Sequence, residues 1–309
     1  MSLYFFSLEN IIFSLITYLL ALIGFWGSLV FYNSYLPDIA HKEQQDKISA
    51  KGFSLGYIGS VILLLICLAM VMMVEETQAI QMMKYSFLLV GIWWIGFSQY
   101  TYYYLPDNKN SNKMHKNVIF NGFRELLKVW HQIKNILPLK RYLAAFFVYS
   151  MAVQTIMIIA AYFGEKEVQW GSDSKRTTGL IISILVIQLV AVFGAWITSK
   201  LVEKFGNIKV LMLLNFLWIL ICTYAYFVVT PNDFYIAAFF VGLVMGGIQS
   251  LSRSTYSKFI PSDTKDTTSF FSFYDVAEKV GIVIGMLTYG YIADITGKIQ
   301  NAILFLILF

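Results

Sequence analysis

Long apolar runs are the feature that most restricts what this chain can fold into. A helix needs about 20 predominantly apolar residues to cross the ~30 Å hydrocarbon layer of a bilayer. Eight such runs and a shorter final one are present, at residues 10–35, 53–74, 85–105, 143–163, 178–199, 209–229, 234–252 and 272–293, and then 302–309. They predict an all-α polytopic membrane protein with about eight full spans and a partial ninth.

The composition excludes an ordinary soluble protein. Of the 309 residues, 58% are hydrophobic and 13% are charged, against about 45–50% and about 25% in a soluble domain. We therefore expect a multi-pass protein of a bacterial-type cell membrane, with the bilayer as its main surroundings.

The basic residues are divided unequally between alternate loops. Seventeen lie in one set of loops, at Lys42, Lys47, Lys51, Lys109, Lys113, Lys116, Arg124, Lys128, Lys134, Lys140, Arg141, Lys200, Lys204, Lys209, Arg253, Lys258 and Lys265. Five lie in the other set, at Lys84, Lys166, Lys175, Arg176 and Lys298. Cytoplasmic loops carry the excess of Lys and Arg, so the first set is predicted to be cytoplasmic. The net charge of +5 thus reports topology and not a nucleic-acid partner.

The longest polar connection, 107–142, separates residues 1–106 from residues 143–309. Three spans precede it, and five spans and the short final run follow it. If both halves are repeats of six spans, as in many transporters, three spans are missing upstream and the last is cut. The segment 1–8 also lacks a basic flank, which favours an odd number of missing spans. We therefore expect a fragment of a longer protein.

Within that connection, residues 117–137 predict an amphipathic helix that ends at Pro138. Its apolar positions are Ile119, Phe123, Leu126, Leu127, Trp130, Ile133 and Leu137, opposed by Arg124, Lys128 and Lys134. A basic helix of this kind suits a membrane surface, so we interpret it as a cytoplasmic strap between two bundles. A calmodulin-like peptide target would have the same pattern.

Five stretches carry a resemblance to a known family. They are YNSYLPD at 32–38, GFSLGYIG at 52–59, YSMAVQT at 149–155, GGIQSLSRS at 246–254 and FSFYDVAEK at 271–279. In this order they resemble the vacuole-effluxer-like branch of the major facilitator superfamily, over essentially the whole chain. The resemblance implies a 6+6 helical bundle and a secondary active transporter that moves a small solute, with neutral amino acids as a candidate class, by alternating access. Where the branch often has Asn-Asp-Gly, this chain has Ser150, Met151 and Ala152, which puts a proton-carrying carboxylate at that place in doubt.

The sequence offers several candidates for gating. Residues 201–209, LVEKFGNIK, are similar to the superfamily's Asp-Arg-x-Gly-x-Lys turn, with Glu203 and Lys204 keeping the charge signs. In the superfamily this turn latches the cytoplasmic gate, although an ordinary polar loop would also contain such charges. Asp38 and Arg253 lie at cytoplasmic helix ends, where gating pairs and snorkelling anchors have the same sequence pattern.

Other polar residues are candidates for solute binding and coupling. Asp275, Glu278 and Lys279 have i, i+3, i+4 spacing and share a helix face. If that helix enters the membrane near Ser269, Lys279 lies about 15 Å deep; if the span is 280–297, all three lie at the interface. The uncharged candidates for the cavity are Tyr149, Gln154, Gln188 and Gln249, each of which could instead bridge two helices. The expected partners are a small-molecule substrate, the lipid bilayer and a coupling proton.

No enzyme or cofactor motif is found. His41, His115 and His131 lack a second ligand at metal spacing, and Cys67 and Cys222 lie in apolar runs. Three glycine pairs, 52/56, 242/246 and 281/285, have the spacing of close helix packing, or of hinges. A channel, a non-transporting receptor and an intramembrane enzyme are the alternatives to a transporter, and the sequence predicts neither metal nor cofactor.

Overall fold

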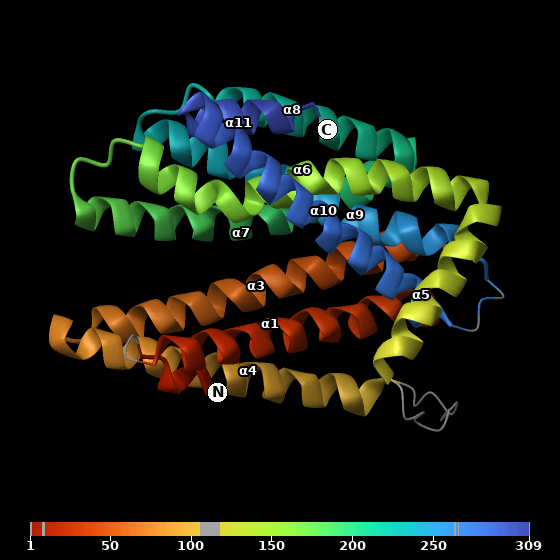
Figure 1. Ribbon diagram of the computed structural model, residues 1–309, viewed down its shortest axis with the longest axis horizontal. Helices are drawn as coiled ribbons and strands as arrows, with labels where there is room; N and C mark the ends of the chain where they lie inside the picture. The colour runs from red at the N-terminus through yellow and green to blue at the C-terminus, as the bar shows by residue number, and fades with distance from the viewer. Residues whose placement is uncertain (1, 8–9, 106–117, 263, 265, 309) are drawn as a thin grey trace. The chain divides into compact units, whose positions relative to one another are not determined.

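The computed structural model describes residues 2–7, 10–105, 118–262, 264 and 266–308, and every element in these ranges is a helix. Figure 1 labels them as η1 (Ser2–Phe5), α1 (Ile11–Ser34), α2 (Leu36–Ile39), α3 (Gln45–Met72), α4 (Glu76–Tyr104), α5 (Val118–Asn135), α6 (Leu137–Glu167), α7 (Asp173–Phe205), α8 (Asn207–Ala225), α9 (Pro231–Phe259), α10 (Thr267–Thr296) and α11 (Ile299–Leu306). The predicted all-α fold is confirmed.

Most of the predicted spans correspond to helices that are long and apolar enough to cross a membrane. Within the described residues, seven are long and apolar enough to cross a membrane: Ile11–Ile39, Gln45–Met72, Gln78–Tyr104, Leu137–Glu167, Asp173–Phe205, Asn207–Ala225 and Pro231–Phe259. The eighth predicted span, 272–293, lies in α10, a helix of 30 residues with three charges in its first half. It is not among these seven, so its crossing of the membrane stays a prediction. The partial ninth is α11, with eight residues. Most helices extend beyond the apolar runs because polar residues continue the helix at its ends.

The amphipathic helix α5 ends earlier than predicted. It ends at Asn135, and Leu137 already belongs to α6. Pro138 lies in the first turn of α6, where proline is tolerated because its missing N–H has no helical partner there. The predicted start at residue 117, and the basic residues Lys109, Lys113, Lys116 and Lys265, lie outside the described residues.

The chain forms two compact units, described here separately. Unit 1 consists of Met1–Leu29 and Gly59–Phe123, and unit 2 of Val30–Ile58 and Arg124–Phe309. In unit 1, η1 packs on α4. There the Gln81 amide donates to the Tyr4 hydroxyl at 3.1 Å, and the rings of Tyr4 and Tyr85 lie 5.6 Å apart. The predicted division at 107–142 concerns repeats of spans in the sequence. These compact units do not test it, so it stays a prediction.

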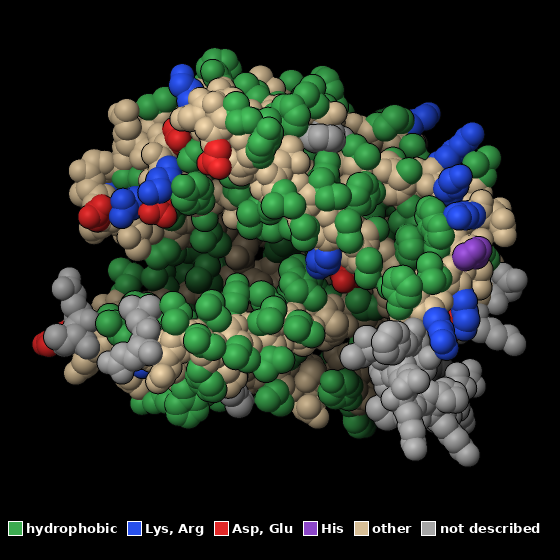
Figure 2. Space-filling view, in the orientation of Figure 1, with side chains coloured by type: hydrophobic (Ala, Val, Ile, Leu, Met, Phe, Trp, Pro, Cys, Tyr) green, Lys and Arg blue, Asp and Glu red, His purple; other side chains and the backbone are tan. Residues whose placement is uncertain are grey.

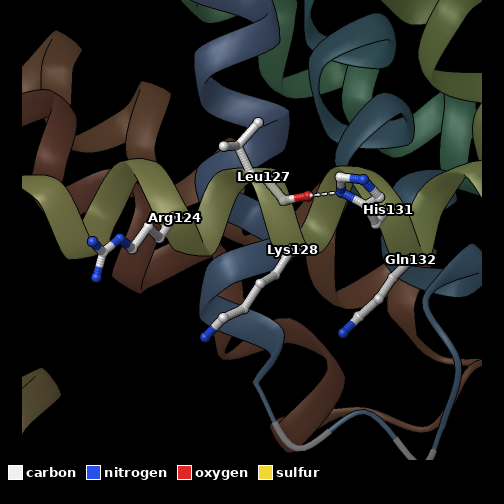
Figure 3. A pocket seen from close by; sticks show the side chains of 5 residues that line it. All are labelled: Arg124, Leu127, Lys128, His131 and Gln132. Atoms are coloured by element: carbon white, nitrogen blue, oxygen red, sulfur yellow. Dashed lines mark hydrogen bonds between the residues drawn. The ribbon is translucent and has the colours of Figure 1, made fainter.

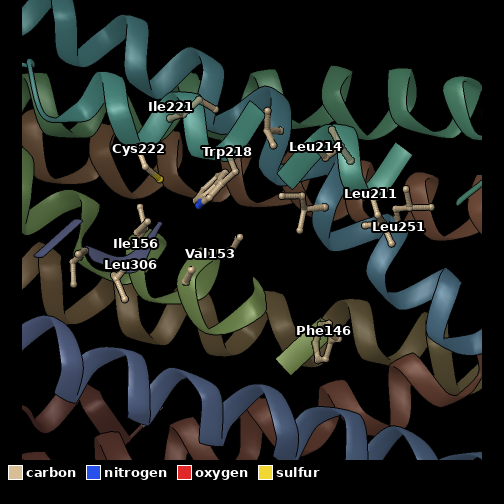
Figure 4. Packing of buried hydrophobic residues seen from close by; sticks show 14 of the residues in the cluster. Phe146, Val153, Ile156, Leu211, Leu214, Trp218, Ile221, Cys222, Leu251 and Leu306 are labelled. Carbon is tan, nitrogen blue, oxygen red and sulfur yellow. The ribbon is translucent and has the colours of Figure 1, made fainter. Parts of the chain in front are cut away.

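The core of unit 2 is made of side chains from several helices. Phe146 of α6, Leu214 and Trp218 of α8, Leu251 of α9 and Leu306 of α11 are all buried in one cluster (Figure 4). The α11 segment is thus held to the bundle by its apolar residues, and it adds to the same core.

Glycine brings the helices of unit 2 into backbone contact. The most extensive contact is between α7 and α9. A Cβ on Gly246 would lie 2.1 Å from the Ala191 carbonyl oxygen, and one on Gly242 would lie 2.5 Å from that of Ile187. The predicted packing role of this glycine pair is therefore confirmed, because any side chain here would force α7 and α9 apart.

Large apolar side chains remain exposed along the helices. On α7, Phe193 is 63% exposed and Trp196 is 60% exposed, and Figure 2 shows hydrophobic side chains over much of the visible face. Exposed apolar patches of this extent are unusual in soluble monomers. They are the surface expected of helices that face lipid.

Candidate transport site and gate

The three charges of α10 form one connected group. Asp266 caps the helix by accepting from the Ser269 N–H at 3.0 Å, and the helix continues unbroken through the charges. Lys279 Nζ lies 2.6 Å from Glu278 Oε2 and 3.5 Å from Asp275 Oδ1. Two carboxylates thus share one ammonium, and the group carries a net charge of −1 when all three are ionised.

This charged group also contacts a neighbouring helix. Gln154 Nε2 donates to Glu278 Oε1 at 2.6 Å, and Gln154 lies near the middle of α6. From Thr267, the first residue of α10, to Lys279 is about 18 Å along the axis at 1.5 Å per residue. Of the two positions considered from the sequence, this geometry favours the one in which the charges lie within the span.

Tyr149 belongs to a different polar group, between α6 and α9. Its hydroxyl lies 2.7 Å from Ser252 Oγ and 3.3 Å from the Tyr142 hydroxyl, which itself donates to the Ser252 carbonyl at 2.7 Å. Tyr149 and Gln154 therefore contact different helices. Both side chains bridge helices in this conformation.

The other two amides differ in how well their hydrogen-bonding groups are paired. Gln249 Oε1 accepts from the Tyr57 hydroxyl at 2.5 Å, which joins α9 to α3. Gln188 Oε1, on α7, is buried without a hydrogen-bond partner in the described part of the chain. An unpaired buried acceptor is costly, so Gln188 is the predicted cavity residue with an acceptor free for a ligand.

The guanidinium of Arg253, on α9, is buried against side chains of α1 and α3. Its Nε donates to Ser49 Oγ at 3.0 Å, its Nη2 to the Ser49 carbonyl at 3.1 Å and its Nη1 to Asn33 Oδ1 at 3.0 Å. The guanidinium also lies over the rings of Tyr32 and Phe53, at 5.3 and 4.6 Å. Arg253 is 5% exposed, and no carboxylate of the described residues pairs with it. The arrangement is a buried anchor rather than a snorkelling side chain.

Gly52 makes room for this anchor. A Cβ at this position would lie 2.7 Å from the Tyr32 hydroxyl oxygen and 3.3 Å from Arg253 Nη2. The first glycine of the 52/56 pair therefore serves a close approach of side chains, whereas a Cβ on Gly56 would meet nothing within 4 Å.

A second polar group joins α3 to α8 and α9. Lys258 forms an ion pair with Asp46, and its Nζ also donates to Asn207 Oδ1 at 3.1 Å. Asn207 Nδ2 in turn donates to Asp46 Oδ1 at 2.7 Å and to Thr255 Oγ1 at 3.0 Å. The Asp46 and Lys258 side chains are 11% and 24% exposed. Asp46, Lys258 and Asn207, which we call the α3–α9 latch, were not predicted from the sequence.

Among the described residues, the predicted latch residues of the neighbouring turn contact side chains of their own helix. Glu203 lies 3.7 Å from Lys200, and Lys204 Nζ lies 5.4 Å from the ring centre of Phe205. Asn207 follows Gly206, whose φ of 81° turns the chain into α8, and it is Asn207 that reaches α3. The gating role predicted for this turn stays a prediction. The glycine followed by a helix-starting Asn was the sequence signal for the contact that Asn207 makes. Asp38 is exposed on α2, and no ion pair of the described residues includes it.

The described residues contain no group of three or more His, Cys, Asp or Glu that could hold a metal. Cys67 and Cys222 are free thiols.

Comparison with known proteins agrees with this geometry. The family described as "Vacuole effluxer Atg22 like" matches residues 1–309. The chain belongs to this vacuole effluxer family.

Individual relatives support the same assignment. The MFS-type transporter YxiO of Bacillus subtilis (strain 168) is 32% identical over 97% of this chain and 69% of its own length. Autophagy-related protein 22-1 of Aspergillus niger and autophagy-related protein 22 of Eremothecium gossypii are each 26% identical, over 84% and 85% of this chain. The chain spans 44% and 53% of these two fungal relatives.

A solved structure has the same fold. A crystal structure of the Escherichia coli fucose:proton symporter FucP matches with a TM-score of 0.59 and 15% identity, over 90% of this chain and 70% of that chain. This vacuole effluxer family member is thus a multi-pass membrane protein with the major facilitator fold, of the kind found in bacterial cell membranes. Its relatives place it among secondary transporters and not among enzymes.

Proposed function

We propose that this member of the vacuole effluxer family moves a small solute by alternating access, with the α3–α9 latch and Arg253 as parts of its gate. The observation that carries the proposal is the set of polar contacts between residues 32–53, which precede the 107–142 connection, and α8 and α9, which follow it. Alternating access requires contacts that close one end of the pathway and can separate again.

The chemistry of these contacts suits separation. An opening gate admits water, and hydrogen bonds between protein groups are then exchanged for hydrogen bonds to water at small net cost. A seam of large apolar side chains would instead expose its area to water at about 25 cal/mol per Å². Asp46, Lys258, Asn207 and the guanidinium of Arg253 are groups that water solvates well.

We propose that the charged group of α10 carries the coupling proton. With Asp275, Glu278 and Lys279 all ionised, the group has one negative charge in excess, and one proton makes it neutral. Ionisable residues within spans commonly mark proton pathways. Residues 150–152 of α6 are Ser, Met and Ala, and Glu278 beside Gln154 supplies an acid to the same region from α10.

Neutral amino acids are the substrate class that we propose. Gln188 Oε1 is an unpaired acceptor suited to the ammonium of a zwitterion, and uncharged amides bind such a ligand without bringing a fixed charge into lipid. The description of the family as vacuole effluxers agrees with export of a small solute.

Counterflow tests the proposal. The protein is reconstituted in liposomes loaded with a mixture of unlabelled neutral amino acids, and uptake of a trace of labelled mixture is measured, with sugar-loaded liposomes as the control. We expect transient accumulation of label only in the amino-acid-loaded liposomes, and faster uptake with a pH gradient. Equilibration without exchange would identify a channel, and no uptake of any amino acid would overturn the substrate class.

A further inference from the structure

The helix α5 has an inner face that fixes it to unit 2. Val129 is 3% exposed and Ile133 is fully buried. The ring of Trp130 stacks on Phe273 of α10, with centroids 5.7 Å apart and planes 11° apart. These contacts leave the opposite face of α5 uncovered.

The uncovered face holds a shallow pocket with basic side chains. Its lining residues are Arg124, Leu127, Lys128, His131 and Gln132, all of them exposed. Figure 3 shows Arg124, Lys128 and Gln132 pointing to the same side of α5, while Leu127 and His131 point to the adjacent side. His131 Nδ1 donates to the Leu127 carbonyl at 2.7 Å, which orients the ring.

The pocket has an excess of positive charge. No carboxylate lines it. Glu125 lies 2.5 Å from Lys128, but both side chains are well exposed, and such surface pairs hold their partners weakly. Figure 2 shows Lys, Arg and His side chains gathered at the edge of the molecule over α5. An anion would therefore be attracted to this face.

The contacts of α5 also fix its level in the bundle. Phe273 lies in the second turn of α10, and α6 begins at Leu137, directly after α5. In Figure 1, α5 runs across the ends of α6 and α10 and not alongside them. Helices that enter the bilayer at this end place α5 at the level of the lipid headgroups, on the side predicted to be cytoplasmic.

We propose that the outer face of α5 binds the phosphate of an anionic phospholipid. Arg124 and Lys128, one helical turn apart, supply N–H donors for the phosphate oxygens. Leu127, which is 43% exposed, contacts the apolar part of the same lipid. The level of the pocket and its mixture of basic and apolar residues favour a lipid over a soluble anion. One lipid molecule can place its phosphate on the basic side chains and its apolar part on Leu127, whereas a soluble anion uses only the basic side chains.

Lipid binding to the intact protein tests this inference. The protein is placed in phosphatidylcholine nanodiscs with increasing phosphatidylglycerol, and retained lipid is measured by native mass spectrometry. We expect selective retention of phosphatidylglycerol, and an apparent affinity about tenfold lower in the double variant Arg124→Gln/Lys128→Gln. The matched control, Lys175→Gln/Arg176→Gln, removes the same charge from the start of α7 and should retain lipid as the unmodified protein does.

Each other outcome overturns the inference. Equal retention by the double variant would place the lipid elsewhere, and equal retention of phosphatidylcholine would exclude selection by charge. Displacement of the bound lipid by millimolar glycerol 3-phosphate would show a site for free phosphate. The single variant Lys128→Gln, with size-exclusion profiles of all variants, separates a lost site from a misfolded protein.

Discussion

The amide of Gln154 donates a hydrogen bond of 2.6 Å to Glu278, which lies 124 residues further along the chain. This bond joins the middle of α6 to the charged group of α10. Gln154 thereby holds one oxygen of Glu278, while Lys279 holds the other. A change in the charge of Glu278 therefore alters side-chain contacts on both α6 and α10.

The first prediction concerns proton coupling. The variant Glu278→Gln keeps the size of the side chain and removes the titrating group, so uptake should lose its stimulation by a pH gradient while counterflow remains. Glu165→Gln, a matched change at an exposed position of α6, should keep both activities. Stimulation by a pH gradient in Glu278→Gln would exclude Glu278 as the proton carrier.

The second prediction concerns the α3–α9 latch. Lys258→Met leaves the carboxylate of Asp46 without its ion-pair partner in a half-buried place, which should destabilise the closed conformation by roughly 1–3 kcal/mol. We expect a cysteine placed at Ser49 to react faster with a cytoplasmic maleimide in this variant. Lys209→Met, an exposed lysine of the same region, is the control.

A double-mutant cycle isolates the ion pair itself. If Asp46 and Lys258 act together, Asp46→Asn/Lys258→Met should shift the reactivity by less than the sum of the two single changes. Strictly additive shifts would show that the two side chains are not coupled.

The third prediction concerns the contact between α7 and α9. Gly246→Ala places a Cβ 2.1 Å from a backbone carbonyl oxygen, and overpacking of this kind costs about 1–3 kcal/mol. A lower melting temperature in detergent is expected. At Gly290 on α10 a Cβ would meet nothing within 4 Å, so Gly290→Ala should keep or slightly raise the melting temperature, since Ala favours a helix. Equal melting temperatures for the two variants would contradict the packing argument.

The sequence predicted the helices because the bilayer imposes a length on each of them. Runs such as 178–199 and 234–252 had to form spans, and α7 and α9 contain them. The partners of individual side chains do not follow from the length of the helices.

Asp46 and Lys258 are 212 residues apart, and each has the local sequence of an ordinary charged helix end. Glu203 and Lys204 matched a known turn, yet Asn207 makes its contacts, because the geometry after Gly206 decides which side chain faces α3. The buried oxygen of Gln188 is unpaired because the described residues of neighbouring helices place no hydrogen-bond donor beside it, and this too does not follow from the local sequence.

The last prediction concerns the orientation of the chain in the membrane, which determines the side on which the α3–α9 latch and the outer face of α5 lie. Lys47 at the start of α3 and Lys175 at the start of α7 are both exposed, and the distribution of basic residues puts them on opposite sides of the membrane. In a background with Cys67 and Cys222 replaced by Ala, Lys47→Cys should react with a membrane-impermeant maleimide only in inside-out vesicles, and Lys175→Cys only in intact cells. Both cysteines lie at helix starts and differ mainly in their predicted side, so each is the control for the other's reactivity. The reversed pattern would place the α3–α9 latch and the basic face of α5 outside the cell, where the inner-leaflet lipid proposed for α5 could not reach it.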